Sequence, residues 1–324
     1  MSDRYARQMV LPQIGAEGQA RLGASSVLVI GAGGLGCAVL PYLAAAGVGR
    51  LVIADHDRVE ESNLHRQPLF RMSELGQSKA VVARDSLRQL NPQITIDAIV
   101  ERLSPANVSS LTSMADLVID AADSLAATYV SSDECVRVHK PLVSASVLGL
   151  SGYVGAFCGG APSYRAVFPE MPRQAGSCSE AGVLGTAVGV MGTLQAHITL
   201  SLLLGLQPSP LGELITVDFR SLRFGGFSFR GAAESVASAF GFISPDEVGE
   251  GDVAVDLRSL EEAPVSPIVD ALRLQVEDIE RGNRQFPADA RVVLCCRSGV
   301  RAWRAARALE RQGHRRLALV AFGG

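Results

Sequence analysis

The first half of the chain alternates short runs of aliphatic and β-branched residues with longer segments of helical periodicity. This alternation predicts a mostly parallel β-sheet covered by helices, because parallel strands must be joined by crossover elements. The expected strands are Val27–Ile30, Leu51–Ala54, Ile94–Val100, Leu117–Asp120, Leu142–Ala145, Tyr153–Phe157 and Ile215–Arg223. A helix is expected from Ser73 to Leu90, where Asn91-Pro92 ends the helical pattern.

A second and smaller α/β unit is predicted behind a stretch of glycine and other small residues. Its expected elements are strands at Val253–Leu257, Arg291–Cys295 and Leu317–Val320 and a basic helix at Val300–Gln312. We therefore place a first domain at residues 1–230, a linker at 231–245 and a second domain at 246–324.

One long stretch, from Ala181 to Gly212, contains no Asp, Glu, Lys or Arg and is long enough to span a bilayer. It also contains Gln195, His197 and several Thr and Gly, and it lacks aromatic or basic flanks. A helix at 182–206 that is buried inside the protein or at a subunit interface explains this composition better than a membrane span.

Composition fits a globular protein with a large core, at 48% hydrophobic and 19% charged residues. The net charge of -3 gives no basic surface of the kind that nucleic acid requires, so no nucleic-acid or membrane partner is expected. The N-terminal sequence MSDRYARQMVLP has no apolar signal segment, which indicates a cytoplasmic protein. The six cysteines follow no disulfide framework and are expected to be free thiols.

A glycine-rich motif, Gly31-Ala-Gly-Gly-Leu-Gly36, follows the strand VLVI and opens a helix. Gly31 permits a tight turn, Gly33 lets the backbone approach a phosphate, and Gly36 allows close packing of helix and strand. Asp55, at the end of the next strand, is placed to bind ribose hydroxyls. These residues predict a Rossmann-like nucleotide-binding domain. By themselves they fit a nicotinamide or flavin site as well as an ATP site.

Further charged residues after Asp55 favour ATP. Arg66 and Lys79 could hold a triphosphate and stabilise charge on departing pyrophosphate. Asp123 follows the strand LVID at the carboxyl edge of the sheet, where it could bring Mg²⁺ to the phosphates. A nicotinamide-dependent oxidoreductase, which is the alternative, needs none of these residues.

At this point the sequence resembles the ThiF/MoeB/HesA group, relatives of the ubiquitin-activating enzymes that adenylate ubiquitin-like sulfur carriers. The matching stretches are RYARQMVLPQIG, GAGGLG, DHDRVEESNLHRQ, GQSK, Asp120-Ala-Ala-Asp123 and SCSEAGVLG. They occur in the family's order over residues 4–223, which is about two-thirds of the chain.

The resemblance implies roles for individual residues and an ATP·Mg²⁺ cofactor. Asp55 would contact the ribose, and Asp123 would be the Mg²⁺-linked acid. Arg7 would reach the ATP of a neighbouring subunit, which implies a homodimer. The residues that would surround the nucleotide are Gly31, Gly33, Gly34, Gly36, Asn63, Arg66 and Lys79.

The chain departs from the family at the structural zinc. Family members usually carry two C-x-x-C pairs, but here the first pair's positions hold Ser163 and Ala166. The segment SLRFGGFSF, where the second pair should lie, has no cysteine. Zinc needs thiolates or imidazoles in tetrahedral number, so we predict no zinc and expect apolar packing to hold these loops.

Two cysteines are candidates for sulfur chemistry. Cys178 lies in SCSEAGVLG, where many relatives have a cysteine on a loop over the carrier's tail, and an inert thiol is the alternative. The segment VVLCCRSGVRAW resembles the rhodanese family, with Cys296 at the nucleophile position and Arg297–Arg301 as the loop. Loop N–H groups and arginines should hold the pKa of Cys296 well below about 8.5. Cys295 should point into the core.

The expected function is ATP-dependent adenylation of the C-terminal Gly-Gly carboxylate of a ubiquitin-like sulfur carrier, followed by sulfur transfer to give a thiocarboxylate. Arg66, Lys79, Asp123, Cys178 and Cys296 would be catalytic. A cysteine desulfurase or thiosulfate would supply the sulfur. The second domain is short for a rhodanese, so an adenylating enzyme with an inactive rhodanese remnant is a further alternative.

Overall fold

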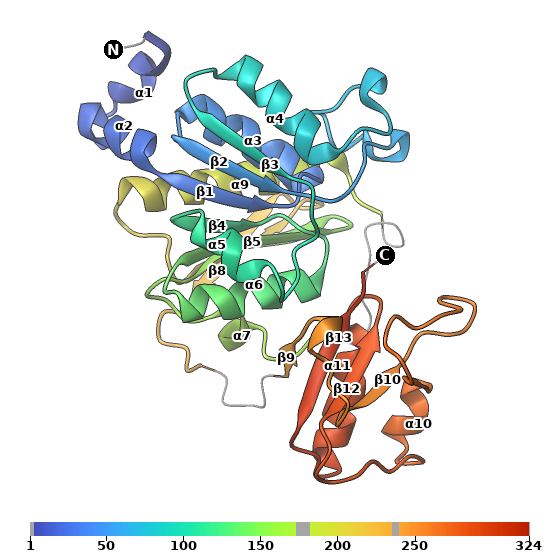
Figure 1. The fold of residues 1–324 in the computed structure, drawn as a ribbon. Helices are drawn as coiled ribbons and strands as arrows, with labels where there is room; N and C mark the ends of the chain where they lie inside the picture. The colour runs from blue at the N-terminus through green and yellow to red at the C-terminus, as the bar shows by residue number, and fades with distance from the viewer. Residues whose placement is uncertain (1–2, 173–181, 235–239, 324) are drawn as a thin grey trace.

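The computed structural model describes residues 3–172, 182–234 and 240–323, and it contains two β-sheets (Figure 1). The first sheet has eight strands in the order β3-β2-β1-β4-β5-β6-β7-β8. Its strands are β1 (Ser26–Ile30), β2 (Arg50–Ala54), β3 (Thr95–Ile99), β4 (Leu117–Asp120), β5 (Pro141–Leu148), β6 (Ser151–Cys158), β7 (Glu213–Asp218) and β8 (Arg223–Ser228). Pairing is parallel from β3 to β5 and antiparallel from β5 to β8.

Helices cover both faces of the parallel part, so the central strands are buried almost completely. The longer helices are α2 (Gly15–Ala24), α3 (Gly34–Ala46), α4 (Lys79–Leu90), α6 (Leu125–Arg137) and α9 (Gly185–Leu204). Shorter ones are η1 (Asp3–Tyr5), α1 (Ala6–Met9), η2 (Glu61–Asn63), η3 (Met72–Glu74), α5 (Val108–Ser113) and α7 (Tyr164–Val167). The predicted doubly covered, mostly parallel sheet is therefore confirmed.

Two boundaries differ from the sequence-based expectation. The helix expected from Ser73 begins at Lys79 instead, because Gly76 adopts φ +79° and ends the short η3 turn before it. The strand expected at Ile215–Arg223 is a hairpin, in which Leu222, at φ +54°, lies between β7 and β8.

Helix α9 is the apolar segment whose composition also allowed a membrane span. Among the described residues, α9 is the one helix that is long and apolar enough to cross a membrane. In the structure, 56% of its most apolar stretch is buried inside the protein. It packs on α3 and on β5 and β6. The side chain of Gln195 is buried and donates a 2.8 Å hydrogen bond to the Asp120 carbonyl, as a core helix residue would.

The second sheet is parallel throughout, with the strand order β11-β10-β12-β13-β9. Its elements are β9 (Gly241–Phe242), η4 (Pro245–Glu247), β10 (Val253–Asp256), β11 (Leu272–Arg273), α10 (Val276–Glu280), β12 (Val292–Cys296), α11 (Val300–Arg311) and β13 (Leu317–Ala321). Strand β9 lies within the range 231–245 that the sequence suggests as a linker. We call residues 3–234 the N-terminal domain and 240–323 the C-terminal domain.

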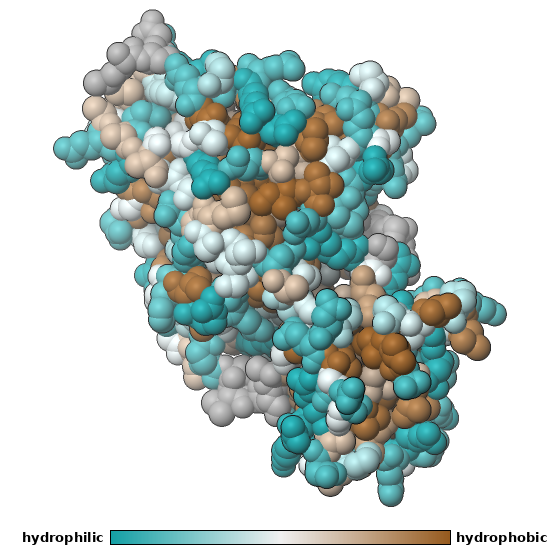
Figure 2. Space-filling model, viewed as in Figure 1, coloured by the Kyte–Doolittle hydropathy of each residue, from teal (hydrophilic) through white to brown (hydrophobic). Residues whose placement is uncertain are grey.

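The C-terminal domain lies beside α6 and α7 of the N-terminal domain (Figure 1). On the face shown in Figure 2, apolar residues gather in the middle of each domain, and hydrophilic residues surround them. One cluster of buried apolar side chains runs from Leu28 and Tyr129 in the N-terminal domain to Trp303 in the C-terminal domain. The two domains therefore share part of their core.

Ser163, at the position expected for the first C-x-x-C pair, is hydrogen-bonded to Glu234, which follows the segment SLRFGGFSF. The buried Ser163 caps α7, and its hydroxyl and backbone N–H donate to the Glu234 carboxylate at 2.6 and 2.8 Å. Phe157 stacks on Phe229 nearby, with ring centroids 4.9 Å apart. Apolar packing thus accounts for only part of what holds these loops, because Glu234 supplies a polar link that the sequence did not indicate.

This pair gives a stability prediction. Ser163→Ala removes one hydrogen bond to a carboxylate and the α7 cap, and should lower the free energy of unfolding by about 1–3 kcal/mol. Ser221→Ala is the control, because its 2.7 Å bond to Asp218 is exposed, and should cost less than about 0.5 kcal/mol. Urea unfolding of both variants measures the difference. Equal losses would contradict the role given to Glu234.

Candidate active site

The turn between β1 and α3 leaves no room for side chains, which explains its glycines. Gly31 has φ +95°, and a Cβ there would lie 2.7 Å from the Ala121 carbonyl oxygen. A Cβ on Gly36 would lie 2.1 Å from the carbonyl oxygen of Gly31. The chain therefore turns tightly from strand to helix, and the first turn of α3 opens at the carboxyl edge of the sheet.

Asp55 closes one side of this turn. It lies just after β2, is 7% exposed, and accepts hydrogen bonds from the backbone N–H groups of Ala32 at 2.6 Å and Asp57 at 2.7 Å. Burial raises the pKa of Asp55, and the two backbone donors oppose that rise. The carboxylate is thus fixed against the glycine turn, where the sequence predicted a ribose contact.

Lys79 approaches the same edge from α4. Because α4 begins at this residue, its side chain leaves the first turn of the helix and its ammonium lies 3.0 Å from the Asp57 carboxylate. Lys79 is only 4% exposed, whereas Asp57 is exposed. The later helix start found above is therefore what places this cation beside Asp55.

Arg66 covers the start of α3. Its guanidinium donates to the Asn63 side-chain oxygen, and its Cγ would lie 3.6 Å from a Cβ on Gly34. The N-terminus of α9 packs beneath it, since a Cβ on Gly185 would meet the His65 carbonyl. The predicted phosphate-binding residues Asn63 and Arg66 thus meet at the glycine turn.

Two aspartates lie at the end of β4 in different environments. Asp123 is exposed and follows β4 at the carboxyl edge of the sheet, and its role with Mg²⁺ stays a prediction. Asp120 is buried beneath it and accepts from the Ser144 hydroxyl at 2.8 Å. Burial raises the pKa of Asp120 to about 6, although the hydrogen bonds from Thr128, Ser144 and Ala122 oppose the rise.

Arg7, a further predicted residue, is not brought into the glycine-turn site of its own chain. Arg7 is exposed on α1, and none of the described hydrogen bonds or ion pairs links it to the glycine turn of its own chain. Cys178 lies outside the described residues. The role of each stays a prediction.

The structure also places a residue that the sequence reasoning left without a role. Gln67 is 3% exposed, and its side-chain oxygen has no hydrogen-bond partner. Its amide nitrogen lies 3.8 Å from where a Cβ of Gly33 would be. A buried amide with an unused oxygen costs free energy unless something else satisfies it, so Gln67 fits a group that meets the nucleotide. The position of Gln67 directly after Arg66 was the signal in the sequence that could have indicated this role.

Oxygen and nitrogen ligands for a cation gather at the same edge. Asp55, His56 and Asp57 offer ligand atoms within 4.8 Å of one another, a grouping found once among the residues that the structure describes. Hard oxygen ligands of this kind suit Mg²⁺ held jointly with phosphates. Asp123 is not part of this group.

Cys296 ends β12 at the start of the rhodanese-like loop. Its sulfur accepts hydrogen bonds from the backbone N–H groups of Gly299 at 3.1 Å and Ala302 at 3.4 Å, the predicted cradle. The expected low pKa is nevertheless wrong: the residue is 0% exposed, and burial raises the pKa of its thiol against the opposing effects of these N–H groups and Arg301. Cys295 faces the other side of the sheet, and burial raises its pKa to about 12.

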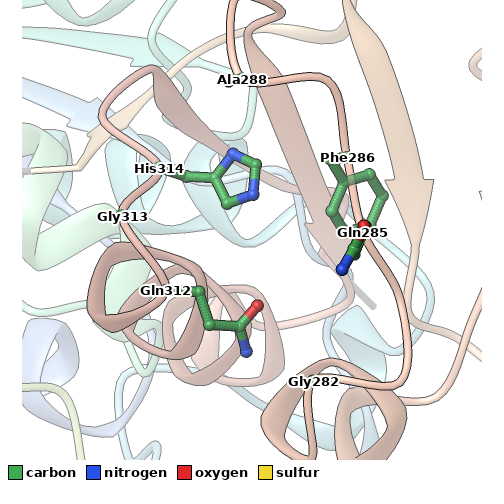
Figure 3. A pocket seen from close by; sticks show the side chains of 7 residues that line it. All are labelled: Gly282, Gln285, Phe286, Ala288, Gln312, Gly313 and His314. Atoms are coloured by element: carbon green, nitrogen blue, oxygen red, sulfur yellow. The ribbon is translucent and has the colours of Figure 1, made fainter.

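One open cavity on the C-terminal domain and a second between the two domains lie away from the glycine turn. The first, of about 360 Å³, is drawn in Figure 3, where His314, Gln312 and Phe286 surround it. The second, of about 770 Å³, lies between Glu170 and the arginines of α11. Neither contains a residue of the nucleotide site.

Comparison with known proteins identifies the family to which the chain belongs. The sequence profile of the ThiF family matches residues 5–235, well over half of the chain. The chain belongs to the ThiF family. This membership favours nucleotide-dependent activation over the nicotinamide alternative.

Individual relatives agree with the family assignment. The chain is 45% identical over 218 residues to the pig (Sus scrofa) protein named adenylyltransferase and sulfurtransferase MOCS3, covering 66% of this chain and 48% of that protein. It is 44% identical over 224 residues to the sulfur carrier protein adenylyltransferase of Thermus thermophilus, covering 67% and 83%. The chain spans about half the length of the MOCS3 relatives that it matches.

Solved structures show the fold of this ThiF-family chain. Escherichia coli MccB with ATP superposes with a TM-score of 0.61 at 21% identity, covering 73% of each chain. A structure of MccB without a named ligand gives 0.63 at 20% identity, covering 72% of each.

The unpaired amide of Gln67 gives a binding prediction. Gln67→Leu should weaken ATP binding about 2–10-fold, because the Gln67 side-chain oxygen can accept a hydrogen bond from a ribose hydroxyl or an adenine N–H, and a neutral hydrogen bond of this kind contributes about 0.5–1.5 kcal/mol. Isothermal titration calorimetry measures the affinity. Thr112→Val is the control, since Thr112 is also buried with an unpartnered oxygen but lies on α5, and it should leave affinity unchanged. Unchanged ATP affinity in Gln67→Leu would show that the amide is structural.

The raised pKa of Asp120 gives a pH prediction. A carboxyl whose pKa rises from about 3.9 to about 6 on folding favours folding while protonated, and this contribution is lost as pH rises through 6. Asp120→Asn removes the titration. The unfolding free energy of the variant relative to wild type should therefore increase by roughly 2–3 kcal/mol between pH 4 and 7 and then stay constant. A difference that does not change with pH would contradict the assignment.

Proposed function

We propose that this ThiF-family protein adenylates the C-terminal Gly-Gly carboxylate of a ubiquitin-like sulfur-carrier protein with ATP and then transfers sulfur to it. One observation carries the first half of the proposal. Asp55, Arg66 and Lys79 come from three segments and meet around the glycine turn at one edge of the sheet. The name of the Thermus relative, sulfur carrier protein adenylyltransferase, supports this substrate class, and the name of the pig relative supports adenylyl and sulfur transfer.

In the first step a carboxylate oxygen of the carrier attacks the α-phosphorus of ATP, and pyrophosphate leaves. The product is a carrier acyl-adenylate. Arg66 and Lys79 stabilise the charge that develops on the departing phosphates, and Asp55 orients the ribose. Mg²⁺, if held by Asp123 or by the Asp55–Asp57 group, would neutralise phosphate charge. No general base is required, because the attacking carboxylate is already an anion.

In the second step the terminal sulfur of a Cys296 persulfide attacks the acyl carbon and AMP leaves. The resulting acyl disulfide is opened by a second thiolate, for which Cys178 is the candidate. The carrier leaves as a thiocarboxylate, and the two cysteines are joined by a disulfide. An external thiol must then reduce that disulfide before the next cycle. The persulfide itself comes from a cysteine desulfurase or thiosulfate.

The remaining expectations concern assembly, metal and location. Arg7 is exposed and outside the site of its own chain, which is consistent with a homodimer in which it reaches a partner's ATP. Ser163 and Ala166 supply no thiolate, so we infer an enzyme without structural zinc. A cytoplasmic location, without nucleic-acid or membrane partners, stays part of the proposal.

A second candidate function is adenylation alone, with an inactive C-terminal remnant. The complete burial of Cys296 and the raised pKa of its thiol favour this alternative. The N–H cradle around the sulfur favours transfer. The two candidates differ in whether Cys296 ever carries a persulfide.

The adenylation step is tested by carrier-dependent ATP–pyrophosphate exchange. Arg66→Ala and Asp123→Ala should each lower the exchange rate about 10²–10³-fold, since each removes one preorganised charge from the reacting phosphates. Arg84→Ala is the control, because Arg84 pairs with Asp85 on α4, outside the glycine turn, and it should retain the wild-type rate. Near-normal exchange in both site variants would reject the assignment.

The sulfur step is tested by mass spectrometry after incubation with thiosulfate or a cysteine desulfurase. One sulfur atom should be added, at Cys296 and not at Cys295, because only the former sulfur receives the loop N–H groups. Cys296→Ala should stop thiocarboxylate formation and leave pyrophosphate exchange intact. A wild-type protein that never gains sulfur would establish the adenylation-only alternative.

A further inference from the structure

The C-terminal domain is held against the N-terminal domain in a defined orientation. The guanidinium of Arg165, fixed by Asp133 at 2.6 Å, lies 4.7 Å from the ring centroid of Tyr129 and 5.6 Å from that of Trp303 on α11. The Trp303 indole donates to Glu170 at 3.2 Å. Buried aromatic and cation–π contacts of this kind favour one orientation over a loose tether.

A charged contact closes the outer edge of the same interface. Glu170, just after α7, also pairs with Arg307 one helical turn beyond Trp303, with the Arg307 Nε 3.0 Å from its carboxylate. Glu170 therefore receives two donors from α11, and both come from the other domain.

The orientation places the Cys296 loop at the edge of the nucleotide site. A Cβ on Gly299, whose N–H cradles the Cys296 sulfur, would lie 3.6 Å from the Ala126 side chain. Ala126 is in the first turn of α6, three residues after Asp123. The loop therefore faces the same end of the sheet that presents the predicted Mg²⁺ acid.

The residues after β13 link the loop to the opposite side of that site. Gly323 donates a 2.8 Å hydrogen bond to the Arg297 carbonyl and is so close to the Arg102 guanidinium that a side chain at 323 would displace it. Arg102 in turn lies 2.6 Å from His56, which neighbours Asp55 and Asp57. The loop thus contacts the β4 side through Gly299 and is linked to the β2–β3 side of the same adenylation site through Gly323 and Arg102.

We propose that Cys296 delivers sulfur to the adenylation site of its own chain, in the docked arrangement set by Trp303, Arg165 and Glu170. This inference rests on the proposed function. It adds that the acyl-adenylate and the persulfide that attacks it belong to one polypeptide. Exchange of the carrier between two copies of the protein is then unnecessary.

Docking also controls which partner reaches the thiol. Ala126 and the Phe242 ring lie against Gly299, and Cys296 is fully buried. A sulfur donor from outside must therefore load Cys296 while the domains are apart. Redocking returns the loop to the adenylation site of its own chain, where the loop must turn the persulfide outward before its outer sulfur can attack the acyl carbon. Weakening the Glu170 contact should expose Cys296 and slow the transfer without affecting ATP chemistry.

The first experiment separates transfer within a chain from transfer between chains. Two pairs of differently tagged copies are each co-expressed, purified together and compared at equal concentration. The first pair combines an Arg66→Ala copy with a Cys296→Ser copy. The second pair combines a wild-type copy with a copy that carries both Arg66→Ala and Cys296→Ser. Both pairs carry the same substitutions. The second pair should make thiocarboxylate at about half the wild-type rate, and the first pair should lose at least about 90% of it.

The possible results have distinct meanings. Equal rates in the two pairs would overturn delivery within the chain while leaving the proposed function intact. Wild-type protein that makes the acyl-adenylate but no thiocarboxylate would end both the sulfur step and this inference.

The second experiment tests the docked interface by the alkylation rate of Cys296 with iodoacetamide. Glu170→Arg opposes Arg307 and should raise this rate at least about tenfold, lower thiocarboxylate formation by a similar factor, and leave pyrophosphate exchange unchanged. Glu280→Arg is the matched control, because Glu280 pairs with Arg304 inside the C-terminal domain, and it should change neither rate. Unchanged alkylation and sulfur transfer in Glu170→Arg would overturn the role of docking.

Discussion

The close approach of the β1–α3 turn to its surroundings is the constraint on which the nucleotide site depends. Gly36 lies so near the carbonyl of Gly31 that any side chain would separate helix from strand. This contact lets α3 begin directly at the sheet edge, where its free N–H groups face the space between Asp55 and Arg66. Side chains in this turn would displace α3, and Asp55 and Arg66 would then no longer face the same binding site.

The charges around that turn are already paired in the protein alone. Lys79 is held by Asp57, Arg66 by Asn63, and Asp55 by two backbone donors. Such pairing keeps buried charges from being unsatisfied and fixes their positions, so that a phosphate need not order flexible side chains on binding. The buried side-chain oxygen of Gln67, by contrast, has no hydrogen-bond partner among the described residues.

The sequence predicted what depends on local chemistry. The glycine turn, the buried strands and the opposite orientation of the two adjacent cysteines follow from short-range periodicity and from residue type. The helix expected from Ser73 was placed too early because Gly76 interrupts it.

Contacts between distant segments could not be predicted from the sequence. The Ser163–Glu234 pair joins residues 71 positions apart, and the Trp303–Glu170 bond joins residues 133 apart. The low pKa expected for Cys296 was wrong for the same reason. Its loop sequence favours an anion, but Cys296 lies in the apolar cluster that residues from both domains form, and burial there raises the pKa.

The central claim is that a carrier carboxylate attacks ATP at the glycine turn. Its most direct test is isotopic: a ubiquitin-like carrier ending in Gly-Gly is labelled with ¹⁸O in its C-terminal carboxylate and incubated with the protein, ATP and a sulfur donor. The bridging oxygen of the acyl-adenylate leaves with AMP when sulfur attacks the acyl carbon. The account predicts AMP with one ¹⁸O atom per turnover, detected by mass spectrometry. Unlabelled AMP, or label appearing in pyrophosphate or inorganic phosphate instead, would contradict it.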